Sequence, residues 1–186
     1  MEIIIILLTI LFNIALSLGI GSSTLVIVNF CVAIADGKIN ADERRMMGVA
    51  YVVLRIALVL LLATSLLLMS LNVQESGLAT YSPFVIAIWT LLFVLYFNAV
   101  LMTLQVMPSA FGPSIQAGTW YTFGIITSLS YLGIFFSVTQ FIIVYISFVL
   151  FVTVLVNGVI MYLDYLRTRG VASTASKNKS DKKKDK

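Results

Sequence analysis

The stretch MMGVAYVVLRIALVLLLATSLLLMSLN, residues 46–72, contains a single charged residue, Arg55. A helix needs about 20 mostly apolar residues to cross the ~30 Å hydrocarbon core of a bilayer, and this stretch is long enough. Three further runs contain no charged residue at all: 3–35, 82–107 and 119–163. These runs predict an all-α, polytopic helical membrane protein.

The composition supports the same class of protein. The 186 residues are 60% hydrophobic and 11% charged, with a mean hydropathy of +1.05, whereas soluble domains are about 25% charged. The chain has no histidine and one cysteine, Cys31. Histidine-ligated metals and an internal disulfide are therefore excluded. We expect no cofactor and no nucleic-acid partner, and the sequence argues against an enzyme.

Polar, Pro-rich or Gly-rich segments divide the apolar runs. Residues 72–80 form a polar loop, and Ser82 is predicted to cap the helix that follows. The Pro and Gly content of 108–118 predicts another loop. The 48 residues of 119–166 exceed one span and are divided near Ser137–Gln140, the only polar cluster close to the midpoint. The sequence thus predicts five spans, at about 3–35, 46–72, 82–107, 119–137 and 140–166.

The basic residues predict an orientation. Of the twelve Lys and Arg residues, eight lie in 167–186 and three more at Lys38, Arg44 and Arg45. With five spans these two regions face the same side, which the positive-inside rule makes cytoplasmic. Residues 1–166 are then one transmembrane domain of the cell membrane, with the N-terminus outside. Residues 167–186 are predicted to be a disordered basic cytoplasmic tail that binds anionic lipids.

A short pattern recurs in the first, third and fifth predicted spans. VNFCVAIAD (28–36), FNAVLMTLQ (97–105) and VNGVIMYLD (156–164) each place a polar residue seven positions after an asparagine. Seven residues are nearly two helical turns, so both polar side chains lie on one helix face. The pattern predicts a parallel two-helix repeat: spans one and two, spans three and four, and a half repeat in span five.

The repeat defines a candidate polar site at one membrane depth. The site comprises Asn29, Arg55, Asn98 and Asn157, and a second layer comprises Asp36, Gln105 and Asp164. Arginine at a bilayer centre costs at least ~2.5 kcal/mol on insertion scales, so a buried one usually faces the bundle or a water-filled cavity. Two alternatives stay open. The asparagines join helices by ordinary hydrogen bonds, and Arg55 reaches the headgroups or pairs with Asp36 or Asp164.

Two functional hypotheses follow. The polar layer favours a small transporter or channel-like protein for a small solute or ion, because internal repeats and buried charges are typical of transporters. The absence of a ligand motif favours a non-catalytic membrane subunit or assembly factor of a larger complex. Besides the lipid bilayer, the expected partners are a second copy of the chain or a larger membrane complex.

Overall fold

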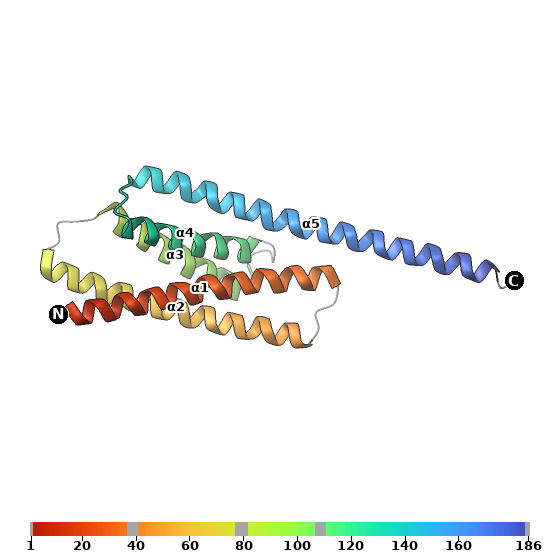
Figure 1. The fold of residues 1–186 in the computed structure, drawn as a ribbon, viewed down its shortest axis with the longest axis horizontal. Helices are drawn as coiled ribbons and strands as arrows, with labels where there is room; N and C mark the ends of the chain where they lie inside the picture. Colours follow the sequence, from red (N-terminus) through yellow and green to blue (C-terminus); the bar gives the residue numbers. More distant parts are fainter. Residues whose placement is uncertain (1, 37–40, 77–81, 107–110, 185–186) are drawn as a thin grey trace.

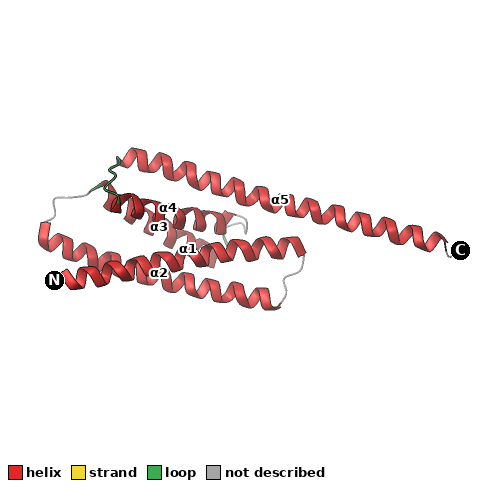
Figure 2. Ribbon diagram, in the orientation of Figure 1, coloured by secondary structure: helices red, strands yellow, loops and turns green. Residues whose placement is uncertain are grey.

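The computed structural model describes residues 2–36, 41–76, 82–106 and 111–184. Within these ranges all regular structure is helical, and no strand occurs (Figure 2). The helices are α1 (Glu2–Asp36), α2 (Ala41–Ser76), α3 (Pro83–Thr103), α4 (Phe111–Tyr131) and α5 (Val138–Lys184). The predicted all-α class is confirmed.

Four of these helices are long and apolar enough to cross a membrane. They are α1, α2, α3 and α5, whose most apolar 18-residue windows have mean hydropathies of 2.8, 2.6, 2.4 and 2.5. The chain is therefore a helical membrane protein by the length and composition of its helices. Helix α4, which is as long as α3 but less apolar, is not among the four, so the prediction of five spans is not confirmed by helix composition.

The helices run back and forth along the long axis of the molecule (Figure 1). Helices α1, α3 and α5 run in one direction, and α2 and α4 return. Helix α4 packs against α1, α3 and α5, whereas α2 packs on α1 and meets α3 at the edge of the bundle. This order gives α4 three helical neighbours and leaves one side of α2 without any.

The core gathers around α4. Trp120 and Phe123 of α4 are fully buried, and apolar side chains from the other four helices pack with them in one cluster, including Phe12, Leu61, Leu95 and Phe141. The outer faces are equally apolar, for example at Val59 of α2 and Val154 of α5. Apolar side chains on both the inside and the outside suit a protein whose surroundings are hydrocarbon.

Helix α4 begins earlier than the sequence predicts. The prediction of a loop over 108–118 is wrong for 111–118, which form the first two turns of α4; residues 108–110 lie outside the described residues. Pro113 lies in the first turn, where proline is tolerated because its missing N–H has no helical partner. Gly112 and Gly118 are buried against neighbouring helices. Tertiary packing thus overrides a weak local preference for helix.

Local hydrogen bonds set the turn between α4 and α5. Gly133 has a φ of 67°, and Gly133 N and Ile134 N donate to Ser130 O and Leu129 O, as in a Schellman motif. Ser137 and Gln140 then form a reciprocal capping box: each backbone N–H donates to the other's side-chain oxygen, at 2.9 and 3.2 Å. The break falls at residues 132–137, and α4 ends six residues before the predicted boundary.

Other helix ends also differ from the predicted spans. Ser82 caps α3 as predicted, because its Oγ accepts a hydrogen bond from Val85 N at 3.3 Å. Helix α2 begins at Ala41 but continues to Ser76, so the prediction of a polar loop from residue 72 is wrong for 72–76, and α3 ends at Thr103 instead of 107. The segment 167–184, expected to be disordered, continues α5 as helix to Lys184.

Replacing Gly133 with alanine tests the turn. The left-handed backbone there disfavours a Cβ by roughly 1–2 kcal/mol, so Gly133→Ala is expected to destabilise the protein by about that amount. The matched control is Gly158→Ala, because a Cβ at this glycine of α5 meets open space. Thermal unfolding of purified protein in detergent measures both variants. Equal midpoints for the two would contradict the proposed role of Gly133.

Candidate functional site

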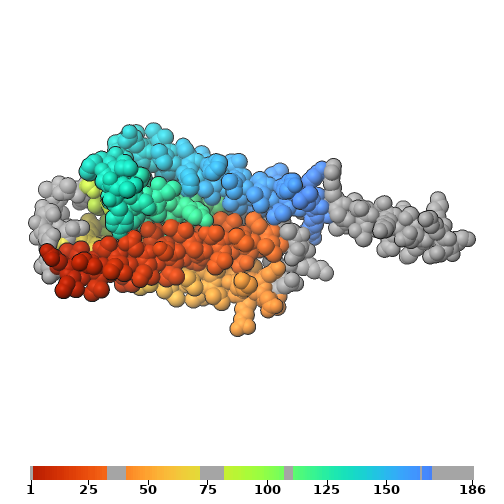
Figure 3. Space-filling view, in the orientation of Figure 1, coloured from red at the N-terminus to blue at the C-terminus, as the bar shows by residue number. Residues whose placement is uncertain are grey.

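Helix α4 carries five of the ten buried polar side chains among the described residues. Among its buried residues are Ser114, Gln116, Thr119, Thr122 and Thr127. Hydrocarbon supplies no hydrogen-bonding groups, so polar side chains in a membrane protein gain by facing other helices. The position of α4 between α1, α3 and α5 provides those partners. A strip of α4 is visible between α1 and α5 in the space-filling view (Figure 3).

An amide pair joins α3 to α4. Asn98 is 2% exposed and Gln116 is 4% exposed. Asn98 Nδ2 donates to Gln116 Oε1 at 2.7 Å and to Gly112 O at 3.1 Å. Asn98 Oδ1 and Gln116 Nε2 have no hydrogen-bond partner among the described residues. The pair therefore contains one buried acceptor and one buried donor that make no hydrogen bond with a described residue. Leaving such groups unpaired reduces the stability of the fold.

Three further hydrogen bonds join α4 to its neighbours. The hydroxyls of Thr24 and Tyr121 lie 2.7 Å apart and link α1 to α4. Asn13 Nδ2 donates to Tyr131 OH at 2.7 Å, between the same two helices. The Thr119 and Tyr145 hydroxyls lie 3.0 Å apart and link α4 to α5. Helix α4 is thus hydrogen-bonded to all three of its neighbours.

Small residues let these helices approach closely. The ring of Trp120 fills the space that a Cβ at Gly19 of α1 would need. On the other side of α4, a Cβ at Gly118 would lie 3.3 Å from Val149 of α5. Packing of this kind is a main source of helix association in membranes, where no hydrophobic effect separates helix from lipid.

The structure places the four predicted site residues in different environments. Asn98 is buried in the amide pair. Asn29 of α1 and Asn157 of α5 are half-buried, and Asn157 Nδ2 donates to Thr153 O of its own helix at 2.8 Å. Arg55 is exposed on α2. The four residues therefore do not form one hydrogen-bonded cluster among the described residues.

Arg55 lies on the outer side of α2. It lies six positions before the fully buried Leu61, which places the two side chains about 120° apart around the helix. No hydrogen bond or ion pair joins Arg55 to another described residue. The charge is therefore directed away from the polar groups around α4.

The second predicted layer is only partly described. Gln105 is exposed and has a φ of 55°. Its backbone N–H donates to Met102 O while Val106 N donates to Leu101 O, so Gln105 occupies the left-handed position that ends α3. Asp36 is the last residue of α1 and Asp164 lies within α5. Their side chains lie outside the described residues.

Gln116 was missed by the sequence analysis because it lies in the segment predicted to be a loop. The signal that could have found it is the spacing of Gln116, Thr119 and Thr122. Polar residues three positions apart follow one face of a helix, which is not expected of a connector.

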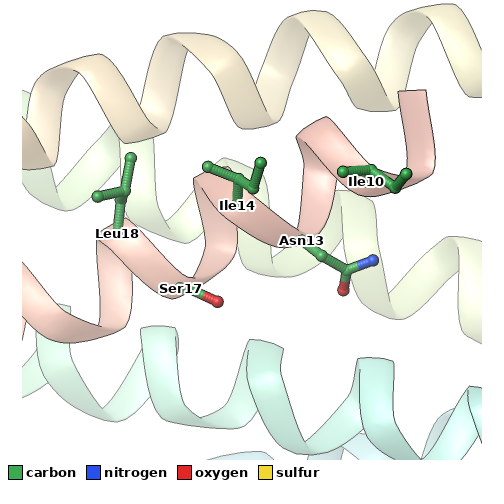
Figure 4. A pocket seen from close by; sticks show the side chains of 5 residues that line it. All are labelled: Ile10, Asn13, Ile14, Ser17 and Leu18. Atoms are coloured by element: carbon green, nitrogen blue, oxygen red, sulfur yellow. The ribbon is translucent and has the colours of Figure 1, made fainter. Parts of the chain in front are cut away.

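An open hollow lies on the outer side of α1. It has a volume of about 480 Å³ and is lined by Ile10, Asn13, Ile14, Ser17 and Leu18. Figure 4 shows Asn13 and Ser17 on one side of the helix, with Ile14 and Leu18 on the other. All five residues belong to α1, and the Asn13 amide already donates to Thr9 O and Tyr131 OH. The hollow therefore lacks the convergent polar groups of an enclosed binding site.

No family model, curated protein or solved structure matches the chain. The described residues also contain no group of three or more His, Cys, Asp or Glu residues that could hold a metal ion. The class of helical membrane protein therefore rests on the helices themselves.

Breaking the amide pair tests its contribution to stability. Asn98→Leu leaves Gln116 buried without its partner and is expected to cost roughly 1–2 kcal/mol. Asn98→Leu combined with Gln116→Leu should recover part of that loss, because both polar groups are then removed. Asn157→Leu is the control, since it loses only a bond within its own helix. Unfolding in denaturing detergent, followed by tryptophan fluorescence, measures the stability of each variant. Equal losses of stability for Asn98→Leu and Asn157→Leu would contradict the role of the amide pair.

Proposed function

We propose that the chain is a non-catalytic subunit of a larger membrane complex. The observation that carries this proposal is the outward position of Arg55 within an apolar helix. An arginine near the bilayer centre costs at least ~2.5 kcal/mol on insertion scales unless a partner compensates its charge. No described residue of the chain does so. A neighbouring protein in the membrane is the natural source of the missing group.

The polar residues around α4 support the same proposal. Asn98 bonds to Gln116 and Thr119 to Tyr145 across helix boundaries, which is how polar side chains hold helices together in membranes. Side chains used in this way stabilise the bundle and contribute no surface for chemistry.

We further propose that α4 is the fifth span. Its 21 residues correspond to about 31 Å of helix, close to the thickness of the hydrocarbon core. Its neighbours α1, α3 and α5 cover its polar side chains, so it does not itself need an apolar surface. Five spans place Arg44 and Arg45 on the same side as the basic end of α5, and the positive-inside rule makes that side cytoplasmic. The two-helix repeat and the binding of the basic end to anionic lipids remain predictions.

Isolation from native membranes tests the subunit proposal. The tagged chain, expressed at its natural level and extracted in a mild detergent, is expected to elute with another membrane protein at a fixed stoichiometry. A tag on that second protein should recover the chain in the same ratio. A monodisperse chain without any partner, extracted equally gently, would overturn the proposal.

A transporter or channel-like protein is the second candidate. The unpaired Asn98 Oδ1 and Gln116 Nε2 favour it, because a donor and an acceptor held together inside a membrane protein suit a small polar solute. In this hypothesis the predicted site residues Asn29, Asn98 and Asn157 line a water-filled path.

Thiol labelling in intact membranes tests this second candidate. Cys31→Ser removes the only native cysteine, and Asn29→Cys, Asn98→Cys and Asn157→Cys are added singly. A path requires that a membrane-impermeant reagent label all three, because the reactive thiolate forms only in water. Val154→Cys is the lipid-facing control, at a position 71% exposed on α5. Labelling no faster than at Val154→Cys in folded protein would exclude a water-filled path.

A further inference from the structure

We propose that the outer face of α2 around Arg55 docks a transmembrane helix of another protein, and that this helix carries an Asp or Glu within its apolar span. The inference rests on the proposed function as a membrane subunit and names the chemistry of the partner. Three observations support it: the shape of the outer face of α2, the charge on that face, and the positions of the acidic residues in the chain.

The exposed residues of α2 form a continuous helical face. Six of them recur at intervals of three and four positions on the side of Arg55: Gly48, Val52, Arg55, Val59, Ala63 and Leu66. Such a row is what one helix presents when its ridges fit the grooves of another. The buried residues Leu54, Leu58 and Leu61 lie about 60–120° around the helix from Arg55 and pack into the core. The outer face is therefore separate from the one that holds α2 in the bundle.

This face has the shape that helix docking in membranes requires. A Cβ at Gly48 would meet nothing within 4 Å, and Ala63 adds a second small residue on the same face. Small residues allow two helix backbones to approach closely. Within the described residues α2 has close backbone contacts with α1 and α3 but none with α4 or α5. The outer side of α2 is thus open for a further helix.

The charge on the face identifies the partner. Arg55 lies four residues from the midpoint of the apolar stretch 46–72, or ~6 Å along the helix. In a hydrocarbon core ~30 Å thick, this places its backbone about 9 Å inside the boundary. Its neighbours on the face are apolar and exposed, at 55% for Val52 and 62% for Val59. Within the membrane, ionisable residues usually pair with one another, so a carboxylate is the group that fits Arg55.

A second copy of the chain does not supply this carboxylate. No Asp or Glu occurs between Glu43 and Glu75, nor between Glu75 and Asp164. The remaining acidic residues lie at Glu2, at Asp36 and Asp42, or in the basic C-terminal segment. None of them lies in the middle of an apolar run. The partner helix therefore belongs to a different protein.

Site-specific crosslinking locates the partner. A photoreactive amino acid replaces Val52 or Val59 on the outer face of α2, or Val154 of α5 as a control of similar exposure. The first two variants should crosslink the same membrane protein and the control should not. The crosslinked peptide is expected to contain an Asp or Glu within an apolar run of about 20 residues.

A charge exchange then tests the ion pair. With the photoreactive residue at Val52, Arg55→Asp should lower the crosslinking yield about tenfold or more, and Arg55→Lys should largely keep it. Replacing the carboxylate of the partner with lysine should restore the yield with Arg55→Asp. Unfolding midpoints of the isolated variants show whether the fold persists, which is expected because Arg55 is exposed. If Arg55→Asp does not fold, Arg55→Gln, which removes the charge without reversing it, replaces it.

Each other outcome overturns the inference in a recognisable way. Crosslinks to lipid alone would assign Arg55 to phosphate headgroups, and crosslinks to the chain itself would assign the face to a second copy. A partner peptide without an acidic residue, or yields insensitive to Arg55→Asp, would remove the ion pair while leaving the subunit proposal intact. A chain that elutes alone in gentle extraction would remove the subunit proposal itself.

Discussion

The fold depends on the need of α4 to find hydrogen-bond partners where lipid offers none. Its buried side chains include an amide and several hydroxyls, which could not face hydrocarbon without large cost. Helices α1, α3 and α5 supply these partners by hydrogen bonds: Thr24 bonds to Tyr121, Asn98 to Gln116 and Tyr145 to Thr119. The close approach of Gly19 to Trp120 and of Gly118 to Val149 follows from the same arrangement. The helix with the most buried polar side chains is thus the one around which the other helices assemble.

The remaining helix, α2, is attached differently. It packs on α1 with apolar side chains and receives one hydrogen bond from α3, from Tyr96 OH to Leu58 O at 3.0 Å. It lies at the edge of the bundle and carries the one charge within the apolar runs, on the side that faces away. The molecule therefore has two distinct regions: a hydrogen-bonded interior around α4 that holds the helices, and an exposed face on α2 that carries Arg55.

The class of the protein could be predicted from the sequence, because the length of an apolar run is a property of the chain alone. The direction in which Arg55 points could not, since α2 is apolar on all sides and its periodicity does not distinguish core from lipid. The start of α4 was missed because Gly112 and Pro113 indicate a loop when their neighbours are unknown. Asn98 was found by its depth, but its partner Gln116 lay in that misassigned segment. The Ser137–Gln140 cluster did mark the last turn, because a capping box is a local interaction that the sequence contains in full.

The polarity of α4 has a consequence for how the protein is made. A segment enters the bilayer from the translocation machinery readily when it is apolar by itself, and α4 is the least suited of the five helices by that measure. Its shielding depends on α1 and α3, which are synthesised before it, and on α5, which is synthesised after it. As the proposed fifth span, α4 is therefore expected to insert cooperatively with its neighbours and to be fully covered only after α5 has emerged from the ribosome.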